Sequence, residues 1–145
     1  MENPTNTTPP NRPNIILLTV DQMRFPMNFK ALSYLGINNE DDFIKYYMPN
    51  LYKYLWEPGV KFSNYYTAAS DCTAARATIH TGLYAYQSYS MLTLITYPPK
   101  LTLQPILHPD FPTIGKLMRE ATYVTPYFGK WHLSYNADEL EDYGL

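Results

Sequence analysis

The chain has 145 residues, of which 46% are hydrophobic, and a formal net charge of −2. It is long enough for one domain with a core of its own, and its slight negative charge gives no reason to expect a nucleic acid or an acidic membrane surface as a partner. Its single cysteine excludes an intrachain disulfide framework and a cysteine-rich zinc site.

The N-terminal stretch, residues 1–13, is polar and rich in proline and is predicted to be a disordered tail. It lacks the basic start and the apolar run of a signal peptide. The longest aliphatic run, IILLTV, is far too short to span a membrane. We therefore expect a cytoplasmic protein with no membrane partner, or a periplasmic or secreted one if a signal has been trimmed from the N-terminus.

Residues 15–20 form a continuous β-branched and aliphatic run, which is typical of a strand buried on both faces. The run ends at Asp21 and Gln22. An aspartate in this place is equally typical of a helix cap or turn and of a ligand to a hard metal ion such as Ca²⁺ or Mg²⁺. Gln22 would either add an amide oxygen to such a site or merely lie next to it.

The middle of the chain alternates between predicted helix and strand. Residues 25–47 have a mixed, aromatic composition that indicates a loop or insertion with a short helix. The stretch MPNLYKYLWEPG predicts a helix with Pro49 in its first turn, ended by EPG. A strand is predicted over residues 60–65.

The only cysteine, Cys72, directly precedes a helix that is predicted from Thr73 to Thr81 and closed by Gly82. A lone cysteine is more commonly a small, inert, buried side chain. At a helix N-terminus, however, free backbone N–H groups and the helix dipole favour an anion. Arg76 would lie on the same face one turn later and suits a tetrahedral oxyanion such as sulfate or phosphate. The spacing does not fit a cysteine phosphatase loop, so an anion site here does not require the thiol as nucleophile.

The C-terminal third predicts a helix over residues 112–121, a strand over 123–128 and a loop from Gly129. Strands that alternate with helices predict an α/β fold, with a mostly parallel sheet flanked by helices. Ligands of such sheets bind at the carboxyl ends of the strands. Three polar clusters follow predicted strands, and their convergence predicts an active site. They contain Asp21 and Gln22, the Cys72 segment, and Lys130 to His132.

Lys130 and His132 alternate, so their side chains would point the same way on an extended segment. In that arrangement a cation and an imidazole face one anionic ligand. A solvated loop end with Trp131 packed inward is an equally good interpretation. His80 and His108 have no such neighbours, and we interpret them as structural or surface residues.

Four stretches of the chain, in the same order, resemble parts of the sulfatase family within the alkaline phosphatase superfamily. These stretches are PNIILLTVDQ, MPNLYKYLWEPGVKFSNYY, CTAARATIHTG and GKWHL. The resemblance runs from Asn14 to about Ser134, and the regions 25–47 and 83–108 match poorly. Any one of these stretches is a weak or moderate signal, but all four in the family's order are a strong one.

The resemblance implies an alkaline phosphatase-like α/β fold that is incomplete in this chain, because enzymes of the family are several times longer. Residues 14–145 would be the N-terminal part of a sulfatase catalytic domain. The remaining metal ligands and a second lysine and histidine around the sulfate would lie outside this chain. We therefore expect the isolated chain to have an unfinished sheet and little or no activity.

By the same resemblance, Cys72 would be oxidised to Cα-formylglycine by a maturation enzyme. An oxygen of the hydrated aldehyde would attack the sulfur of a small-molecule or carbohydrate sulfate ester, and sulfate would leave as the aldehyde reforms. A divalent metal, Ca²⁺ or Mg²⁺ in its place, would polarise the sulfate oxygens. Its ligands in this chain would include Asp21, Gln22 and the modified Cys72.

The resemblance also assigns roles to three further residues. Arg76 would stabilise the formylglycine hydrate and its alkoxide, and Lys130 would contact the sulfate oxygens. His132 would hydrogen-bond the diol or assist its proton transfer. These groups would act where charge is held in the transition state.

The chain departs from the family pattern in three places. Asp21-Gln22 stands where many members carry two acids, a pattern shared with choline sulfatase-like and phosphonate monoesterase-like relatives. Ala74 replaces a commoner proline. Thr122 replaces a glycine that usually ends the helix, where a left-handed backbone disfavours a β-branched side chain.

Two alternatives to sulfate ester hydrolysis therefore stay open. One is hydrolysis of a phosphodiester or a phosphonate monoester on the same scaffold, and the other is a truncated, non-catalytic protein. The sulfated substrate is also undetermined. The tyrosine-rich region 84–97 would suit a pocket for a sugar or an aryl group, and core packing explains it equally well.

Overall fold

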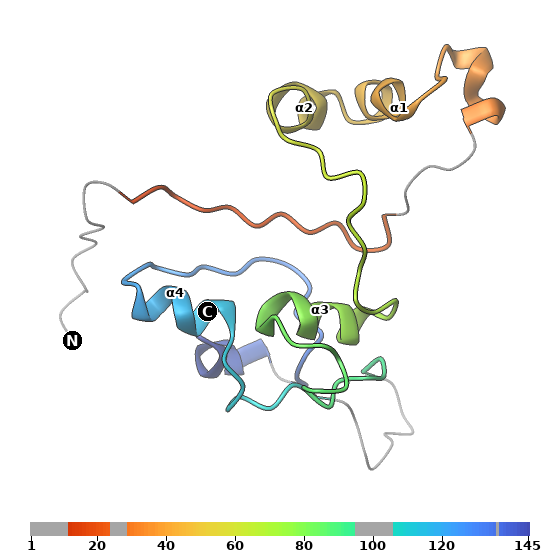
Figure 1. Ribbon diagram of the computed structural model, residues 1–145. Helices are drawn as coiled ribbons and strands as arrows, with labels where there is room; N and C mark the ends of the chain where they lie inside the picture. Colours follow the sequence, from red (N-terminus) through yellow and green to blue (C-terminus); the bar gives the residue numbers. More distant parts are fainter. Residues whose placement is uncertain (1–11, 24–28, 95–105, 136) are drawn as a thin grey trace. The chain divides into compact units, whose positions relative to one another are not determined.

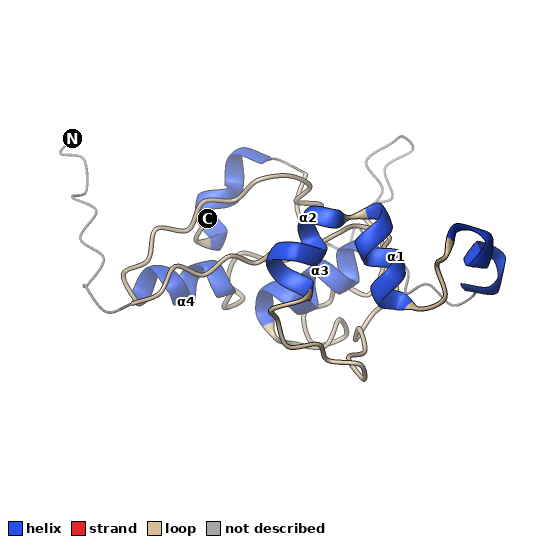
Figure 2. Ribbon diagram, turned by 90° about the horizontal axis from the view of Figure 1, so that it is seen from above, coloured by secondary structure: helices blue, strands red, loops and turns tan. Residues whose placement is uncertain are grey.

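The structure is a computed structural model that describes residues 12–23, 29–94, 106–135 and 137–145 (Figure 1). It divides into two compact units. Unit 1 contains residues 1–17 and 67–145, and unit 2 contains residues 18–66. All regular structure in the described ranges is helical (Figure 2), and none of these helices is long and apolar enough to cross a membrane.

Unit 2 consists of short helical segments joined by tight turns. They are η1 (Phe29–Leu35), α1 (Glu40–Tyr47), α2 (Pro49–Leu51) and the π-helical turn η2 (Tyr52–Trp56). Asn39 caps α1, because its side chain accepts a hydrogen bond from the Asp42 amide at 2.9 Å. Pro49 stands at the first position of α2, where a missing N–H is harmless. The helix predicted from this segment is thus confirmed, and α1 is the short helix expected within residues 25–47.

Unit 1 contains the helices α3 (Cys72–Thr81) and α4 (Ile114–Glu120) and the 3₁₀ helix η3 (Ala137–Tyr143). Gly82 ends α3 with a φ of 70°, a left-handed conformation that glycine adopts without a steric penalty. Thr113 caps α4 by accepting a hydrogen bond from the Lys116 amide. The two helices predicted in this part of the chain are therefore confirmed within two residues at each end.

The core of unit 1 joins α3 to the C-terminal segments. Its buried residues are Ala77, Leu107, Trp131, Leu133 and Tyr143. The Leu107 amide donates to the Leu133 carbonyl at 2.9 Å, and the Tyr143 hydroxyl donates to the Leu107 carbonyl at 2.7 Å. The rings of Trp131 and Tyr143 meet edge to face with centroids 4.9 Å apart. The segment around Trp131 is therefore fixed by packing against buried side chains.

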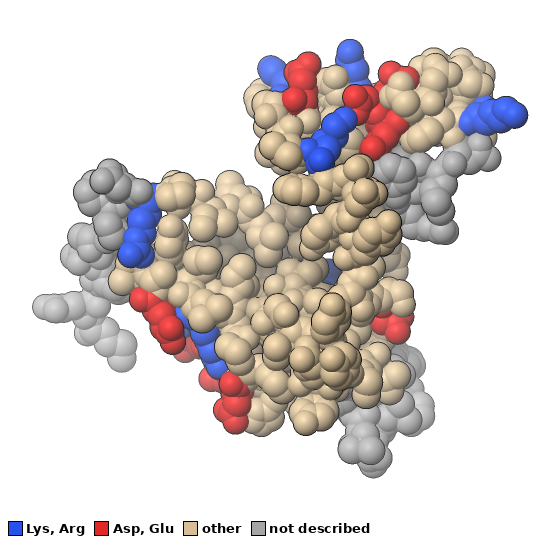
Figure 3. All heavy atoms as spheres, viewed as in Figure 1, with Lys and Arg blue, Asp and Glu red and all other residues tan. Residues whose placement is uncertain are grey.

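The three predicted strands are absent, so the mostly parallel sheet predicted for this chain is wrong for the described residues. Residues 15–20, 60–65 and 123–128 run without a strand partner there (Figure 1). Ile16 and Phe128 are each 89% exposed. Residues other than Lys, Arg, Asp and Glu, drawn in tan, cover most of the surface seen in Figure 3. A strand exists only when a neighbouring strand satisfies its N–H and C=O groups, and the described residues supply no such neighbour.

The predicted disordered tail, residues 1–13, lies outside the described residues except for its last two positions. Arg12 and Pro13 are exposed and belong to no helix. The Arg12 guanidinium donates a hydrogen bond to the Ala121 carbonyl and lies over the ring of Tyr123, 5.9 Å from its centroid. The end of this stretch therefore contacts the residues that follow α4.

Thr122 holds a position that favours glycine, as its sequence context predicts. Its φ is 65°, its amide donates to the Arg119 carbonyl, and the Tyr123 amide donates to the Met118 carbonyl. This pair of bonds is the Schellman motif, which closes a helix through one left-handed residue. A β-branched side chain in that conformation is strained by roughly 1–2 kcal/mol.

Thr122→Gly is expected to raise the free energy of unfolding by about 1 kcal/mol, because glycine relieves this strain. Urea denaturation would measure the change. Thr93→Gly is the matched control, since Thr93 lies outside the left-handed region and glycine there should be destabilising. A destabilised Thr122→Gly variant would contradict the assignment of strain.

Candidate active site

Cys72 is the first residue of α3 and is partly exposed, with its thiol free. The preceding residue, Asp71, is the N-cap, with an extended backbone (φ −94°, ψ 149°) and no hydrogen bond from its side chain into the first turn. The N–H groups of that turn therefore have no side-chain cap from Asp71, and they give the N-terminus of α3 a positive potential. Cys72 and Arg76 are separated by one turn of regular helix, as predicted.

Thr73 connects the first turn of α3 to two segments far away in the sequence. Its buried hydroxyl donates to the His132 carbonyl at 3.1 Å and accepts from the Leu94 amide at 2.8 Å. The His132 ring also contacts Leu94, because its Nε2 lies 2.9 Å from the Leu94 carbonyl oxygen. The segment that carries His132 is thereby attached directly to the helix that carries Cys72.

The His132 ring has a defined tautomer in this arrangement. A carbonyl oxygen only accepts hydrogen bonds, so Nε2 must carry the hydrogen that bonds Leu94. Nδ1 is buried and has no hydrogen-bond partner among the residues that the structure describes. His132 also has a φ of 58°, which interrupts the regular extended segment expected across Lys130 and His132. The expectation of an extended segment, on which the side chains of Lys130 and His132 would point the same way, is therefore wrong.

Arg76 reaches from α3 to the segment 127–130. Its Nη1 donates to the Lys130 carbonyl and lies 3.4 Å from the Tyr127 hydroxyl, which itself donates to the Lys130 carbonyl at 2.6 Å. The guanidinium is thus held against the backbone that precedes Trp131, while Lys130 is exposed. Sequence reasoning missed Tyr127, because nothing in a single tyrosine indicates that its hydroxyl meets an arginine 51 residues away.

His80 packs beneath this segment and is only 7% exposed. Its ring lies 4.9 Å from the Trp131 ring and 5.8 Å from the Tyr127 ring, measured between centroids. Burial, and secondarily the charge of Arg76, lower the pKa of His80 from 6.5 to about 4. The imidazole is therefore neutral at neutral pH and part of the core, which confirms its interpretation as a structural residue.

The predicted site residues fall into two groups. Cys72, Arg76, Lys130 and His132 belong to unit 1, where the contacts of Thr73 and Arg76 join the two segments that carry them. Asp21 and Gln22 belong to unit 2 and are exposed. Gln22 has a left-handed φ of 57°, which is typical of a turn residue.

The described residues do not complete a binding site for a divalent metal. They contain no group of three or more His, Cys, Asp or Glu side chains that could hold an ion. Asp21 and Gln22 supply oxygen donors of the kind that Ca²⁺ prefers, but Ca²⁺ takes about six to eight oxygen ligands. Cys72 as an unmodified thiolate is a soft ligand and suits neither Ca²⁺ nor Mg²⁺.

Tyr127→Phe tests the link between Arg76 and Lys130. Removal of the hydroxyl takes away one of the two hydrogen bonds to the Lys130 carbonyl, and the variant should lose about 1 kcal/mol of unfolding free energy. Urea denaturation of the variant and of Tyr66→Phe, at a tyrosine that is 84% exposed, would measure this difference. Equal midpoints for the two variants would show that the Tyr127 hydroxyl contributes nothing.

Comparison with known proteins gives matches along most of the chain. The family model described as Sulfatase matches residues 13–142. The Uncharacterized sulfatase YidJ of Escherichia coli (strain K12) is 37% identical over 75 residues, which are 52% of this chain and 13% of that protein. The Arylsulfatase of Clostridium perfringens (strain 13 / Type A) is 43% identical over 72 residues, 50% of this chain and 13% of that protein.

Other similarities extend further along the chain. The human (Homo sapiens) Arylsulfatase H is 30% identical over 137 residues, which are 91% of this chain and 22% of that protein. The matched part of this chain thus spans between 13% and 22% of the length of these three relatives. No solved structure matches the chain significantly.

Proposed function

Because the chain belongs to the sulfatase family, we propose that it contributes the nucleophile and part of the anion site to an enzyme that hydrolyses sulfate esters. Residue 72 is the nucleophile position in this proposal, and Arg76, Lys130 and His132 are the groups around it. The alkaline phosphatase-like α/β fold that the family implies would form when further strands pair with the extended segments of this chain.

One observation carries the proposal. The first turn of α3 and the segment 130–132 are 59 residues apart in sequence, and they are joined by the Thr73 hydroxyl and the Arg76 guanidinium. This arrangement brings together the N–H groups at the start of a helix, which Asp71 does not cap, and a guanidinium. Both are donors, and donors of this kind stabilise an oxyanion. The imidazole of His132 lies on the same segment, with its Nε2 hydrogen bonded to the Leu94 carbonyl.

Each residue of the site has a role that its contacts support. Arg76 adds positive charge one turn after residue 72, and its hydrogen bond to the Lys130 carbonyl limits its rotamers. Lys130 is exposed, so its side chain can contact the oxygens of a sulfate group that enters from solvent. The Nε2 hydrogen of His132 bonds the Leu94 carbonyl, which leaves the buried Nδ1 as the ring nitrogen that would act on residue 72.

Formylglycine at residue 72 would supply a hydrated aldehyde, whose oxygen is a nucleophile that no standard side chain offers. The position fits this modification, because Cys72 is partly exposed and residues 60–68 and 70–71 before it are exposed. A maturation enzyme can therefore reach the segment. By the resemblance, Asp21, Gln22 and the modified residue 72 would be ligands of Ca²⁺ or Mg²⁺, and a full set of oxygen ligands would need further donors.

Mass spectrometry of the protein from its native host tests the proposal directly. The tryptic peptide Phe62 to Arg76 contains Cys72, and it should show the thiol replaced by an aldehyde. An unmodified thiol in every molecule would overturn formylglycine catalysis. It would also favour the non-catalytic alternative if no sulfate ester is cleaved.

A second assay separates sulfate from phosphorus chemistry. The same preparation is given an aryl sulfate, a phosphodiester and a phosphonate monoester that share one leaving group. The sulfate is expected to be cleaved fastest. The Asp21-Gln22 pair is the observation that keeps the phosphorus alternative open, and a clear preference for a phosphorus ester would replace the proposal with that alternative.

A further inference from the structure

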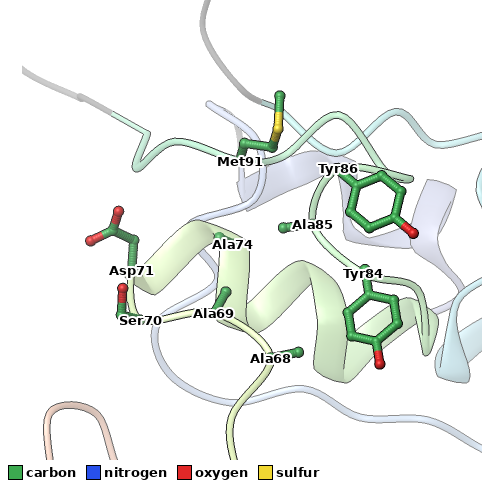
Figure 4. Close-up of a pocket in the computed structure, with 9 residues that line it drawn as sticks. All are labelled: Ala68, Ala69, Ser70, Asp71, Ala74, Tyr84, Ala85, Tyr86 and Met91. Atoms are coloured by element: carbon green, nitrogen blue, oxygen red, sulfur yellow. The ribbon is translucent and has the colours of Figure 1, made fainter.

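Thr73 directly follows the proposed nucleophile position, and its side chain is fully buried. It lies in the first turn of α3 with an exposed fraction of 0%. Its neighbours Asp71 and Ala74 line a small open pocket beside this turn, whose lining does not include Thr73 (Figure 4). The Thr73 hydroxyl therefore faces the interior of unit 1, where a polar group needs hydrogen-bond partners.

The Thr73 hydroxyl takes part in a closed network of three hydrogen bonds with Leu94 and His132. It donates to the His132 carbonyl at 3.1 Å and accepts from the Leu94 amide at 2.8 Å. The Leu94 carbonyl accepts from Nε2 of the His132 ring at 2.9 Å. The network thus holds both the backbone and the ring of His132, and two of its three bonds need the Thr73 hydroxyl.

The backbone of His132 needs such a restraint. Its φ of 58° is left-handed, and a residue other than glycine keeps this conformation only where its surroundings impose it. The neighbours Trp131 and Leu133 are buried, and the Leu133 carbonyl accepts a hydrogen bond from the Leu107 amide. The bond from Thr73 links the strained residue between them directly to α3. Loss of the hydroxyl would therefore let the backbone of His132 relax.

The network also determines which nitrogen of the His132 ring is left for chemistry. Nε2 carries the hydrogen that bonds the Leu94 carbonyl, and Nδ1 is buried without a hydrogen-bond partner in the described part of the chain. Because Thr73 binds the Leu94 amide, it keeps the adjoining Leu94 carbonyl within reach of Nε2.

We propose that Thr73 is a positioning residue. It keeps the hydrogen of the His132 ring on Nε2, and it thereby leaves Nδ1 to accept the proton that an oxygen of residue 72 releases. The proton transfer rests on the proposed function, whereas the hydrogen-bond network does not.

NMR of the His132 ring hydrogen tests the network in the folded chain and does not require activity. A ring hydrogen exchanges rapidly with water unless a hydrogen bond protects it. Labelling of histidine with a nitrogen isotope shows which ring nitrogen carries the hydrogen. The chain has three histidines, so His80→Phe and His108→Asn identify the remaining signal as that of His132. In the wild type we expect a slowly exchanging hydrogen on Nε2.

Thr73→Val keeps the shape of the side chain and removes its hydroxyl. The His132 ring hydrogen should then exchange about tenfold faster or more, which is the effect of losing one hydrogen bond. Thr73→Ser keeps the hydroxyl and should keep the slow exchange. Thr78→Val is the matched control, since it removes a hydroxyl of the same helix whose bond to the Ala74 carbonyl stays within α3. This control should leave the exchange unchanged.

Three results would overturn the network. They are a wild-type ring hydrogen on Nδ1 or in rapid exchange, equal exchange in Thr73→Val and Thr78→Val, and rapid exchange in Thr73→Ser. If Thr73→Val does not fold, the wild-type tautomer and the exchange in Thr73→Ser decide the question.

Kinetics separates this inference from the proposed function. In a preparation that cleaves phenyl sulfate, Thr73→Val should lower kcat by roughly ten- to a hundredfold, because a misplaced imidazole transfers a proton poorly. KM should stay within about twofold, since Arg76 and Lys130 remain to bind the sulfate group. An unchanged kcat would overturn the positioning role and leave the proposed function intact. If the wild type cleaves no sulfate ester but Thr73→Val still speeds exchange at His132, the proposed function is overturned and the network stands.

Discussion

Replacing Cys72 by alanine is expected to lower kcat/KM for an aryl sulfate by roughly a thousandfold or more, in any preparation of the protein that cleaves this substrate. The methyl group of alanine cannot be oxidised to an aldehyde, and it offers no atom that can attack sulfur. Because Cys72 is partly exposed at the start of α3, alanine there creates no buried cavity. The urea midpoint should therefore stay within experimental error of the wild type.

Ile79→Ala is the control for a general effect of substitutions in α3. Ile79 lies in the same helix and is 41% exposed, and no contact of the proposed site involves it. This variant should keep its kcat/KM within a few-fold of the wild type. Full activity in Cys72→Ala would remove residue 72 from the mechanism, and the helix N-terminus would then be only an anion-binding feature.

Acidification is expected to destabilise the chain by about 3 kcal/mol between pH 6.5 and pH 4 through His80 alone, because its folded-state pKa is about 4 and its ordinary value is 6.5. The sign follows from proton binding. Between these two values the unfolded chain binds a proton at His80 and the folded chain does not, so the free energy of unfolding falls as the pH falls. Below pH 4 both states are protonated, and the loss from His80 is complete.

Urea denaturation at several pH values would measure this loss, with His80→Phe as the test variant. Phenylalanine keeps an aromatic ring against Trp131 and Tyr127 but cannot bind a proton. The variant should lack the component of pH dependence that the wild type shows in this window. His108→Asn, at an exposed histidine, should retain it. An identical pH dependence in wild type and His80→Phe would mean that His80 titrates normally in the folded chain.

The helices could be predicted because their signals are local. Asn39 and Thr113 accept hydrogen bonds from residues three positions later, and Gly82 ends α3 with a bond to Thr78. The strained position of Thr122 was also predictable, since one residue at a helix end must be left-handed in a Schellman motif. None of these features depends on a distant part of the chain.

The strands could not be predicted reliably from local signals of this kind. The apolar pattern of residues 15–20 favours a buried strand, but a strand needs a partner, and pairing is not a property of one segment. In the described residues this run has no partner, and Leu17 and Val20 are more than half exposed. The pattern indicates the strand that the family fold would bury, whereas the structure shows the segment without its neighbours.

The amino-acid sequence alone predicted the helix of Cys72 and Arg76, their separation by one turn, and the family through four ordered motifs. The folded structure was needed to show that Thr73 and Tyr127 connect this helix to the segment of Lys130 and His132. It also shows that alanines and tyrosines of residues 68–91 line an open pocket. The difference arises from how far along the chain each kind of interaction acts. Helical geometry and capping act within four residues, whereas a hydroxyl or a ring acquires its role from a partner that only the folded chain brings near.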